Sequence, residues 1–256
     1  GALALWISQD GQRRQVLLDQ GAEVAWPIAS ITKFFTATAA FDLLSLDQAV
    51  TVRPGDLPEP SDPAFLRPGD QFWVADLYYP LLLESSNNTA TLLARQVGEN
   101  KFVAAMNNLA RELKLTATLF INPTGLDPIS PPPAYGRGGE INHASAYDLG
   151  RLAHHLLFER PEVLRISREP SYVLRTANGQ FHHQVKNIDQ LVDYVGWPAK
   201  VVGGKTGQTD VAKKNLLLIL QDEASGDYLI GVVLGADNHF MAMRQLIDWV
   251  YLVYQL

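Results

Sequence analysis

The sequence predicts a mixed α/β protein in which strands from both ends of the chain form one antiparallel sheet. Strand-like runs lie near the N-terminus and again after about residue 171, and the residues between them show helical patterns. This order indicates a sheet flanked by helices, with a helical lobe inserted between its two parts. The hydrophobic share of 47% and the charged share of 19% are typical of a globular chain.

The N-terminal part predicts a hairpin followed by a buried helix. Two strand-like runs, ALALWIS and RRQVLLDQ, flank an Asp10-Gly11 turn. After Ser30, the run ITKFFTATAAFDLLSL is apolar on nearly all sides, so we expect a helix at the centre of the domain. Residues 51–70 carry five prolines and predict a surface loop.

The middle of the chain predicts helices that are interrupted by polar turns. VADLYYPLLLESSNNTATLLARQV is helical in pattern, with a kink expected at Pro80 and a turn expected at SSNN. KFVAAMNNLARELKL predicts an amphipathic helix. A loop rich in proline and glycine, INPTGLDPISPPPAYGRGG, then precedes the helix SAYDLGRLAHHLLF, for which Ser145 is the expected cap.

The last part predicts the remaining strands. Asn-Gly at 178–179 marks a hairpin in SYVLRTANGQFHHQV, and KVVGGKTG, KNLLLILQD and YLIGVVLGA predict strands before a final helix, MAMRQLIDWVYLVYQL. We therefore expect a single domain over residues 1–256. Its sheet lobe would take about 1–50 and 171–256, and its helical lobe about 51–170.

Composition and charge exclude several classes of function. A net charge of −6 without a long basic run argues against a nucleic-acid partner. The chain has no cysteine, which excludes disulfides, thiol catalysis and cysteine-bound zinc. It begins GALALWIS without a methionine, so we expect a trimmed N-terminus from which any signal peptide has already been removed. No run approaches the ~20 apolar residues that span a bilayer.

The first of three strings that can carry chemistry is PIASITKFF, in which Ser30 stands three residues before Lys33. Side chains at this spacing share one face of a helix. Burial lowers the pKa of a lysine, and a neutral Lys33 can then take the proton of Ser30. A serine here also commonly caps a helix while the lysine stem lies along the surface, so this string alone is weak.

The second string is Ser85-Ser86-Asn87, in the turn expected between two helices. A hydroxyl can pass a proton to a leaving nitrogen, and an amide can hold a peptide-like substrate through its donor and its acceptor. Ser86-Asn87-Asn88 fits the same pattern, so the register stays open. An ordinary polar turn is the alternative interpretation.

The third string is Lys205-Thr206-Gly207, at the end of a strand-like run. The lysine and the hydroxyl can bind a carboxylate, and the glycine lets a substrate backbone approach the strand closely. A turn at a strand end is the alternative interpretation. The three strings together, at a helix start, a turn between helices and a strand end, are a specific combination.

These strings belong to a wider resemblance. The chain resembles the low-molecular-mass penicillin-binding proteins of the serine D-Ala-D-Ala carboxypeptidase family over nearly its whole length. PIASITKFFTA, LLLESSNNTATLLA and VVGGKTGQTDVA resemble that family's three motifs, and FINPTGLD and ASAYDLGRLA resemble two further segments. The resemblance implies a DD-peptidase/β-lactamase-like fold in one catalytic, transpeptidase-like domain. It also implies cleavage of peptidoglycan stem peptides through an acyl-serine.

The resemblance further implies a role for each motif residue. Ser30 would be the acylated nucleophile, Lys33 its base and Ser85 a catalytic hydroxyl, with an oxyanion hole made by two backbone N–H groups, one of them from Ser30. The implied substrate-binding residues lie on both sides of the site: Asn87, Lys205, Thr206, Gly207 and Gln208, the last providing the second N–H group. β-Lactam antibiotics would be covalent inhibitors, and no cofactor or metal is expected. The implied location is the periplasm or the outer face of the cytoplasmic membrane of a bacterium.

Several positions depart from the family's pattern. Asn88 stands where an aspartate is common, Ser86 where a glycine is, and residues 212–214 (AKK) replace a glycine-containing run. Members often place an arginine before the last helix to hold the substrate carboxylate, and here ADNHFMAMR offers His239 or Arg244. Many members also carry a β-rich second domain and a C-terminal amphipathic anchor, and this chain ends before either.

Three other functions stay open beside a carboxypeptidase. A D,D-endopeptidase would cut peptidoglycan crosslinks with the same residues. A class A β-lactamase would need a loop glutamate to activate the deacylating water, and the middle loop offers only Asp127 and the distant Glu140. An inactive binding module would have lost at least one motif, and all three are intact.

The histidines do not suggest a metal site. His154-His155 and His182-His183 are adjacent pairs, and no His-x-x-x-His or acidic partner pattern accompanies them. We therefore expect them to be solvated or to lie in the core.

Overall fold

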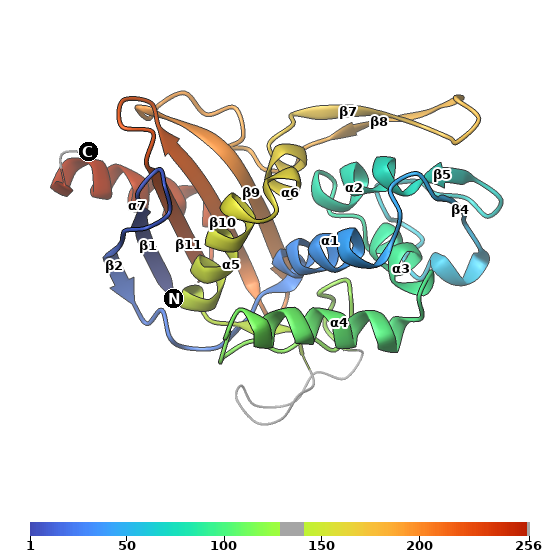
Figure 1. The fold of residues 1–256 in the computed structure, drawn as a ribbon, viewed down its shortest axis with the longest axis horizontal. Coiled ribbons are helices and arrows are strands. Elements are labelled where there is room, and N and C mark those ends of the chain that lie inside the picture. Colours follow the sequence, from blue (N-terminus) through green and yellow to red (C-terminus); the bar gives the residue numbers. More distant parts are fainter. Residues whose placement is uncertain (129–140, 255–256) are drawn as a thin grey trace.

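A computed structural model describes residues 1–128 and 141–254 (Figure 1). The main sheet has five antiparallel strands in the order β2-β1-β11-β10-β9. Their bounds are Ala2–Ile7 for β1, Arg14–Gln20 for β2, Ala199–Thr209 for β9, Lys213–Asp222 for β10 and Tyr228–Ala236 for β11. Because β1 pairs with β11, the two ends of the chain meet in one sheet, which confirms the predicted fold class.

Both faces of the sheet are covered, and strand β10 shows how the sequence achieves this. Leu217 and Ile219 pack in the core shared with the helices of the middle of the chain, whereas Leu216, Leu218 and Leu220 pack against the C-terminal helix. Alternate side chains of a strand point to opposite faces, so a continuous run of large aliphatic residues suits a strand with two buried faces. KNLLLILQD therefore occupies the middle of the sheet.

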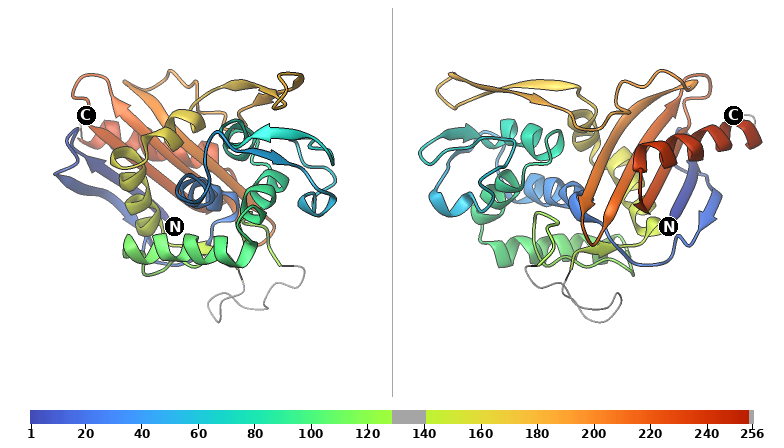
Figure 2. Two further views of the ribbon diagram at one scale, coloured as in Figure 1. Left: turned by 45° about the vertical axis from the view of Figure 1, so that its right-hand side comes forward. Right: turned by 180° about the vertical axis from the view of Figure 1, so that it is seen from behind.

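Helix α7, His239–Tyr254, covers one face of the sheet, and α5, Ala146–Phe158, and α6, Pro161–Ser167, lie on the other face (Figures 1 and 2). Ser145 caps α5 by accepting a hydrogen bond from the N–H of Asp148, as predicted. No helix within residues 1–128 and 141–254 is long and apolar enough to cross a membrane.

The remaining helices form a lobe beside the sheet (Figure 2). They are α1, Thr32–Leu43, α2, Val74–Leu82, α3, Asn87–Arg95, and α4, Glu99–Glu112. Helix α1 is buried along most of its length and contacts each of the other three, which confirms the central helix that its apolar sequence predicts. Pro80 lies within α2, and residues 83–86 separate α2 from α3, so the break falls where the SSNN turn was expected, although Asn87 and Asn88 already belong to α3.

The hairpin of β7, Ser171–Arg175, and β8, Phe181–Lys186, differs from the expectation that residues after 171 extend the main sheet. Its two strands form a separate sheet that packs on α2. Tyr172 stacks on Tyr79 with ring centroids 3.5 Å apart and donates a hydrogen bond to Asp76 at 2.6 Å. These contacts hold the hairpin over the helical lobe (Figure 1).

Short elements escaped prediction because they are too brief to show a period. Strand pairs β3, Trp26–Pro27, with β6, His143–Ala144, and β4, Ala49–Thr51, with β5, Gln71–Trp73, connect segments distant in the sequence. The 3-10 turn η2, Pro54–Asp56, lies in the predicted proline-rich loop.

Candidate active site

Ser30 lies in a 3-10 turn, η1, Ala29–Ile31, that leads directly into α1. The cap position of α1 is Ile31, so Ser30 does not serve as its side-chain cap. Ala29 has a left-handed φ of 47°, and its carbonyl oxygen would lie 2.0 Å from a Cβ atom at Gly125. Only glycine at 125 therefore allows this close packing, which fixes the turn that presents Ser30.

Lys33 is fully buried one helical turn after Ser30. Its Nζ lies 2.8 Å from each of three oxygens: Ser30 Oγ, Asn87 Oδ1 and the backbone carbonyl of Thr124. None of the three carries a negative charge. Loss of hydration on burial therefore lowers the pKa of Lys33 well below its ordinary value, the charge of Lys205 lowers it further, and Asp62 opposes this only in part.

The turn between α2 and α3 brings Ser85 and Asn87 to the same place. Ser85 has a left-handed φ of 62°, and its Oγ accepts a hydrogen bond from Lys205 Nζ at 3.0 Å. Asn87 begins α3 and accepts from Lys33. A non-glycine residue in this conformation is strained, and such residues concentrate at functional sites.

The alternative register of the second string faces away from the site. Ser86 caps α3 by accepting from Thr89 N–H at 2.9 Å and donates to Asp62 at 2.6 Å. Asn88 exchanges hydrogen bonds with the backbone of Glu59. The structure therefore places Ser85 and Asn87 at the site, with Ser86 and Asn88 behind them as supports.

Asp62 is a supporting residue that the sequence did not reveal. Its buried carboxylate accepts hydrogen bonds from the Ser86 hydroxyl and from the backbone N–H groups of Asn87 at 2.7 Å and Asn88 at 3.0 Å. A carboxylate here satisfies the free N–H groups of the first turn of α3 and suits its positive end. It fixes the orientation of Asn87.

The Ser30 turn and the turn between α2 and α3 form the helical wall of the site, and strand β9 forms the sheet wall opposite. Lys205 is buried and donates to Ser85 Oγ and, at 3.1 Å, to the carbonyl of Thr206. Burial lowers the pKa of Lys205 to about 7, although the neighbouring Asp189 opposes that decrease. Burial has the opposite effect on a carboxylate and raises the pKa of Asp189 to about 6. Asp189 Oδ2 has no hydrogen-bond partner.

Gly207 allows the two walls to meet. A Cβ atom there would lie 2.5 Å from the carbonyl oxygen of Ile28 and 3.1 Å from the backbone nitrogen of Ser30. Any larger residue would push β9 away from the turn that carries Ser30. The neighbouring residue Gln208 pairs with Lys214 of β10 at the open edge of the sheet.

Between these walls lies a cavity of about 350 Å³. The predicted site residues that line it are Ser30, Ser85, Thr206, Gly207 and Gln208. His239 and Phe240 from the start of α7 close one side. Of the two candidates for the carboxylate-binding position, His239 reaches this cavity, whereas Arg244 lines a neighbouring one.

The candidates raised by the alternative functions lie elsewhere. Asp127 accepts a long hydrogen bond from Val211 N–H at 3.4 Å and does not line the Ser30 cavity. Glu140 falls outside the described residues.

The adjacent histidine pairs lie away from the Ser30 cavity. His182 and His183 connect the β7–β8 hairpin to Asp70 at 3.4 Å and Glu84 at 3.0 Å. His154 and His155 are half-buried on α5. The described part of the chain contains no cluster of three or more groups that could hold a metal.

Comparison with curated proteins gives a consistent set of relatives. The chain is 32% identical to the D-alanyl-D-alanine carboxypeptidase DacB2 of Mycobacterium tuberculosis over 219 residues, covering 85% of this chain and 70% of that protein. It is 30% identical to DacC of Escherichia coli, covering 95% and 60%. A D-alanyl-D-alanine endopeptidase of Pseudomonas aeruginosa is 28% identical, covering 94% and 74%. The chain thus spans only about three fifths of the Escherichia coli carboxypeptidase.

Solved structures share the fold. The penicillin-binding protein homolog Rv2911 of Mycobacterium tuberculosis has a TM-score of 0.81 at 28% identity, covering 98% of this chain and 91% of that one. Penicillin-binding protein D2 of Listeria monocytogenes, solved in its cefotaxime-bound form, has a TM-score of 0.77 at 26% identity, covering 97% and 96%. Residues 3–238 match the D-alanyl-D-alanine carboxypeptidase family of serine peptidases, and the chain belongs to this family.

Proposed function

We propose that the chain hydrolyses D-Ala-D-Ala-type bonds in peptidoglycan stem peptides through an acyl-serine. Carboxypeptidase activity, the removal of the terminal D-alanine, is the first candidate. The observation that carries this proposal is the 2.8 Å contact between Ser30 Oγ and a lysine that is buried without a carboxylate in hydrogen-bond contact. Membership of the family and the named activities of the relatives support it.

The surroundings of Lys33 suit a neutral amine. Such an amine has two N–H donors and one lone pair. Two of its three neighbours, the Asn87 amide oxygen and the Thr124 carbonyl, can only accept, so they take the two N–H donors. The lone pair then points at Ser30, the one neighbour with a proton to give. Lys33 accepts that proton as Ser30 Oγ forms a bond to the substrate carbonyl carbon.

The opposite wall handles the leaving group and the developing charge. The backbone N–H groups of Ser30 and Gln208 stabilise the oxyanion, and Gly207 permits the close approach of strand and turn that this requires. When the peptide bond breaks, Ser85 passes its proton to the leaving nitrogen, and the proton that Lys33 took from Ser30 restores the Ser85 hydroxyl. Lys205 and Thr206 hold the carboxylate of the leaving residue. Water then attacks the acyl-serine and releases Ser30.

A crosslink-cutting endopeptidase is the second candidate, because one relative carries that name and both substrates present a carboxylate beside the scissile bond. A class A β-lactamase is less well supported, because Asp127 lies away from the Ser30 cavity. The substrate is part of the bacterial cell wall, so the proposal includes export to the periplasm or the outer face of the cytoplasmic membrane.

The test uses benzylpenicillin and purified monomeric muropeptides. The Ser30 hydroxyl is expected to open the β-lactam ring and to form an adduct that persists for minutes or longer, because the opened ring stays attached and shields the ester from water. Intact-protein mass spectrometry is expected to detect the adduct in the wild type and not in Ser30→Ala, and Ser30→Ala should also lose pentapeptide hydrolysis.

Rapid turnover of benzylpenicillin without a trapped adduct would favour the β-lactamase alternative. A folded Ser30→Ala variant that keeps more than a trace of peptidase activity would show that Ser30 is not the nucleophile. Circular dichroism of both proteins provides the folding control.

A further inference from the structure

Another cavity, which we call the distal cavity, lies at the end of the main sheet that is remote from the active site. Its volume is about 420 Å³, and it lies between the β10–β11 turn, the adjoining ends of β1 and β2, and the last turns of α7. Figure 2 shows the C-terminal end of α7 on the side of the sheet away from the helical lobe. Thr206 of the active site pairs with Leu216, whereas Asp222 of the distal cavity ends β10. At ~3.3 Å per residue, the two sites are roughly 20 Å apart along the strand.

Aromatic rings form the walls of the distal cavity. Trp6 of β1 and Tyr251 of α7 pack against the core between the sheet and α7, and both remain partly exposed at its edge. The Tyr254 hydroxyl donates a hydrogen bond of 2.8 Å to the carbonyl of Leu17, which holds the Tyr254 ring at the rim. The faces of these rings carry the negative part of the aromatic quadrupole, so the walls are apolar and still attract a positive group.

Two aspartates add negative charge to the same cavity. Asp222 Oδ1 accepts hydrogen bonds from Ala224 and Ser225 of its own turn, and Asp227 Oδ1 accepts one from the N–H of Gln9 at 2.8 Å. Within residues 1–128 and 141–254, Oδ2 of each carboxylate forms no hydrogen bond and neither group forms an ion pair. The two carboxylates are therefore fixed in position, and each keeps one oxygen for a ligand.

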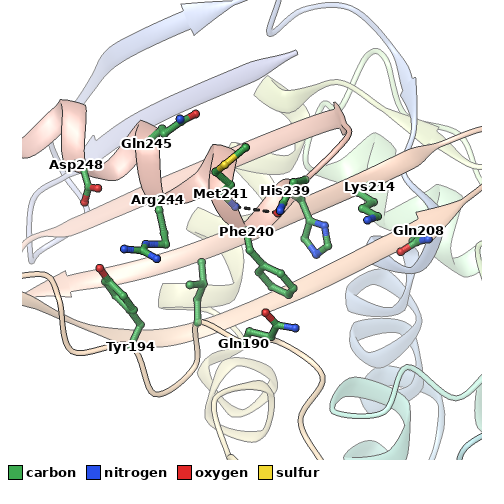
Figure 3. Close-up of a pocket in the computed structure, with 12 residues that line it drawn as sticks. Gln190, Tyr194, Gln208, Lys214, His239, Phe240, Met241, Arg244, Gln245 and Asp248 are labelled. Atoms are coloured by element: carbon green, nitrogen blue, oxygen red, sulfur yellow. Dashed lines mark hydrogen bonds between the residues drawn. The ribbon is translucent and has the colours of Figure 1, made fainter.

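The charge of the distal cavity is not balanced from inside. Among the described residues, no lysine, arginine or histidine lines it. The Arg13 guanidinium lies over the Trp6 ring, 5.6 Å from its centroid, without lining the cavity, so the protein already places one cation on this ring. The cavity beside the active site has the opposite balance, since Figure 3 shows Lys214 and Arg244 along it with one carboxylate, Asp248. The two ends of the sheet therefore favour ligands of opposite charge.

The carboxylates and the rings act on the same space. Burial, together with the negative charge of Asp222, raises the pKa of Tyr251 to about 12. The Tyr251 hydroxyl therefore stays neutral at physiological pH, and it forms no hydrogen bond within the described part of the chain. A cation between Asp222 and Tyr251 would meet a carboxylate oxygen, a phenol oxygen and a ring face together.

The lining groups decide which kind of cation the distal cavity suits. A bare ion such as Ca²⁺ takes about six to eight oxygen ligands, and the described residues contain no group of three or more side chains that could hold a metal. Aromatic faces instead stabilise an organic ammonium group, and most strongly where water is excluded. The volume of about 420 Å³ lies in the range of about 300–1,000 Å³ typical of small-molecule sites, so an apolar stem fits beside the ammonium group.

From the rings, the free carboxylate oxygens and the volume, we infer that the distal cavity binds a ligand that carries an ammonium group on an apolar stem. The ammonium group contacts Asp222 and Asp227, and the stem lies against Trp6 and Tyr251. A lysine-like side chain has this chemistry, and its source is a small free amine or a diamino residue within a stem peptide. The inference goes beyond the proposed function and is independent of the reaction at Ser30.

The test uses two matched probes in ligand-observed NMR titrations at low ionic strength, where charge attraction is least screened. Nα-acetyl-lysine amide carries one ammonium group, and its Nε-acetylated form has the same stem without the charge. We expect the wild type to bind the charged probe at least about tenfold more tightly than the neutral one, the effect of one hydrogen bond between charged groups.

The double variant Asp222→Asn/Asp227→Asn should raise the Kd of the charged probe by about the same factor. Its amide oxygens can still accept the hydrogen bonds of the turn and of Gln9, so the local structure should persist, which circular dichroism checks. Glu223→Gln is the control, because Glu223 is exposed in the same turn and does not line the cavity.

A monomeric pentapeptide with lysine at its third position distinguishes the two sources of the amine. Ser30→Ala is expected to prevent its hydrolysis, so its Kd can be measured with and without the two aspartate substitutions. A rise in this Kd would identify the stem peptide as the source. An unchanged Kd for the pentapeptide, beside a raised Kd for the lysine probe, would identify a small free amine.

Three results would overturn the inference. Equal binding of the charged and neutral probes by the wild type, or binding of neither, would show that the distal cavity does not select an ammonium group, and this comparison needs no variant. An unchanged Kd in the folded double variant would show that the two aspartates do not hold the probe. An equal rise in Glu223→Gln would assign the attraction to general surface charge. None of these results bears on the reaction at Ser30.

Discussion

The two walls of the cleft each bury a lysine, and they surround it differently. On the helical side, Lys33 contacts two carbonyl-type oxygens and a hydroxyl. On the sheet side, Lys205 has a hydroxyl and a carbonyl as partners and a buried carboxylate, Asp189, nearby. A lysine among neutral groups loses its proton readily, whereas a neighbouring anion helps the other lysine to retain it. One type of side chain can therefore supply a base on one wall and a cation on the other.

The positions of the walls reinforce this difference. The charge of Lys205 contributes to the low pKa of Lys33, so a positively charged sheet wall favours a neutral base. Ser85 lies next to Lys205, and Asn87 lies next to Lys33, so the short turn between α2 and α3 contacts both lysines. Substitutions that affect one lysine and spare the other can test the comparison.

Lys33→Gln is expected to give the largest effect, a fall of ~10²–10⁴ in the rate of acylation, because an amide cannot accept the Ser30 proton. The loss should be equal for a pentapeptide with a free C-terminal carboxylate and for its C-terminal carboxamide. Stopped-flow acylation and steady-state hydrolysis measure this effect. Normal acylation of the variant would transfer the role of base to another group, of which Lys205 is the nearest candidate.

Lys205→Gln is expected to give a smaller and selective effect. Loss of a charged hydrogen bond should raise KM for the free carboxylate by ~10–10². The carboxamide substrate should be affected less, because it has no charge for Lys205 to hold. A loss of the same size for both substrates would contradict the assignment of Lys205 to the carboxylate.

The fold and the motif residues could be predicted because they rest on local patterns. The Asn-Gly hairpin, the continuous aliphatic run of β10 and the apolar run of α1 lie in contiguous stretches. The three strings carrying Ser30, Ser85 and Lys205 lie at ends of elements, and the structure brings them around one cavity.

The rest depends on contacts between distant segments. Asp62 lies 24 residues before Ser86, and nothing in the loop sequence marks it as the partner of the α3 N-terminus. The register of the second string depends on the left-handed backbone of Ser85, which no propensity predicts for serine. Asp189 precedes β9 by a loop and comes beside Lys205 only through folding, so the different surroundings of the two lysines could not be predicted from the sequence.

Asp189→Asn is expected to give the smallest effect, and it is the most direct test of the difference between the surroundings of Lys33 and Lys205. Burial lowers the pKa of Lys205 to about 7, even though Asp189 as an anion raises it. Lys205 holds a carboxylate only as a cation, so its contribution is present below that pKa and is lost as the pH rises through it. Removing the anion should therefore move the alkaline limb of the kcat/KM–pH profile to lower pH. Leu191 N–H can still donate to the asparagine oxygen, so the loop should keep its conformation.

The acid limb separates this explanation from a general loss of structure. It reports deprotonation of Lys33, whose low pKa comes first from burial and then from the charge of Lys205. If Asp189→Asn leaves Lys205 neutral over more of the pH range, Lys205 no longer lowers the pKa of Lys33 there. The pKa of Lys33 then rises, and the acid limb should move slightly to higher pH. The profile would then narrow from both sides. A profile that only falls in height, with both limbs in place, would show that Asp189 positions the loop without affecting the charge of Lys205.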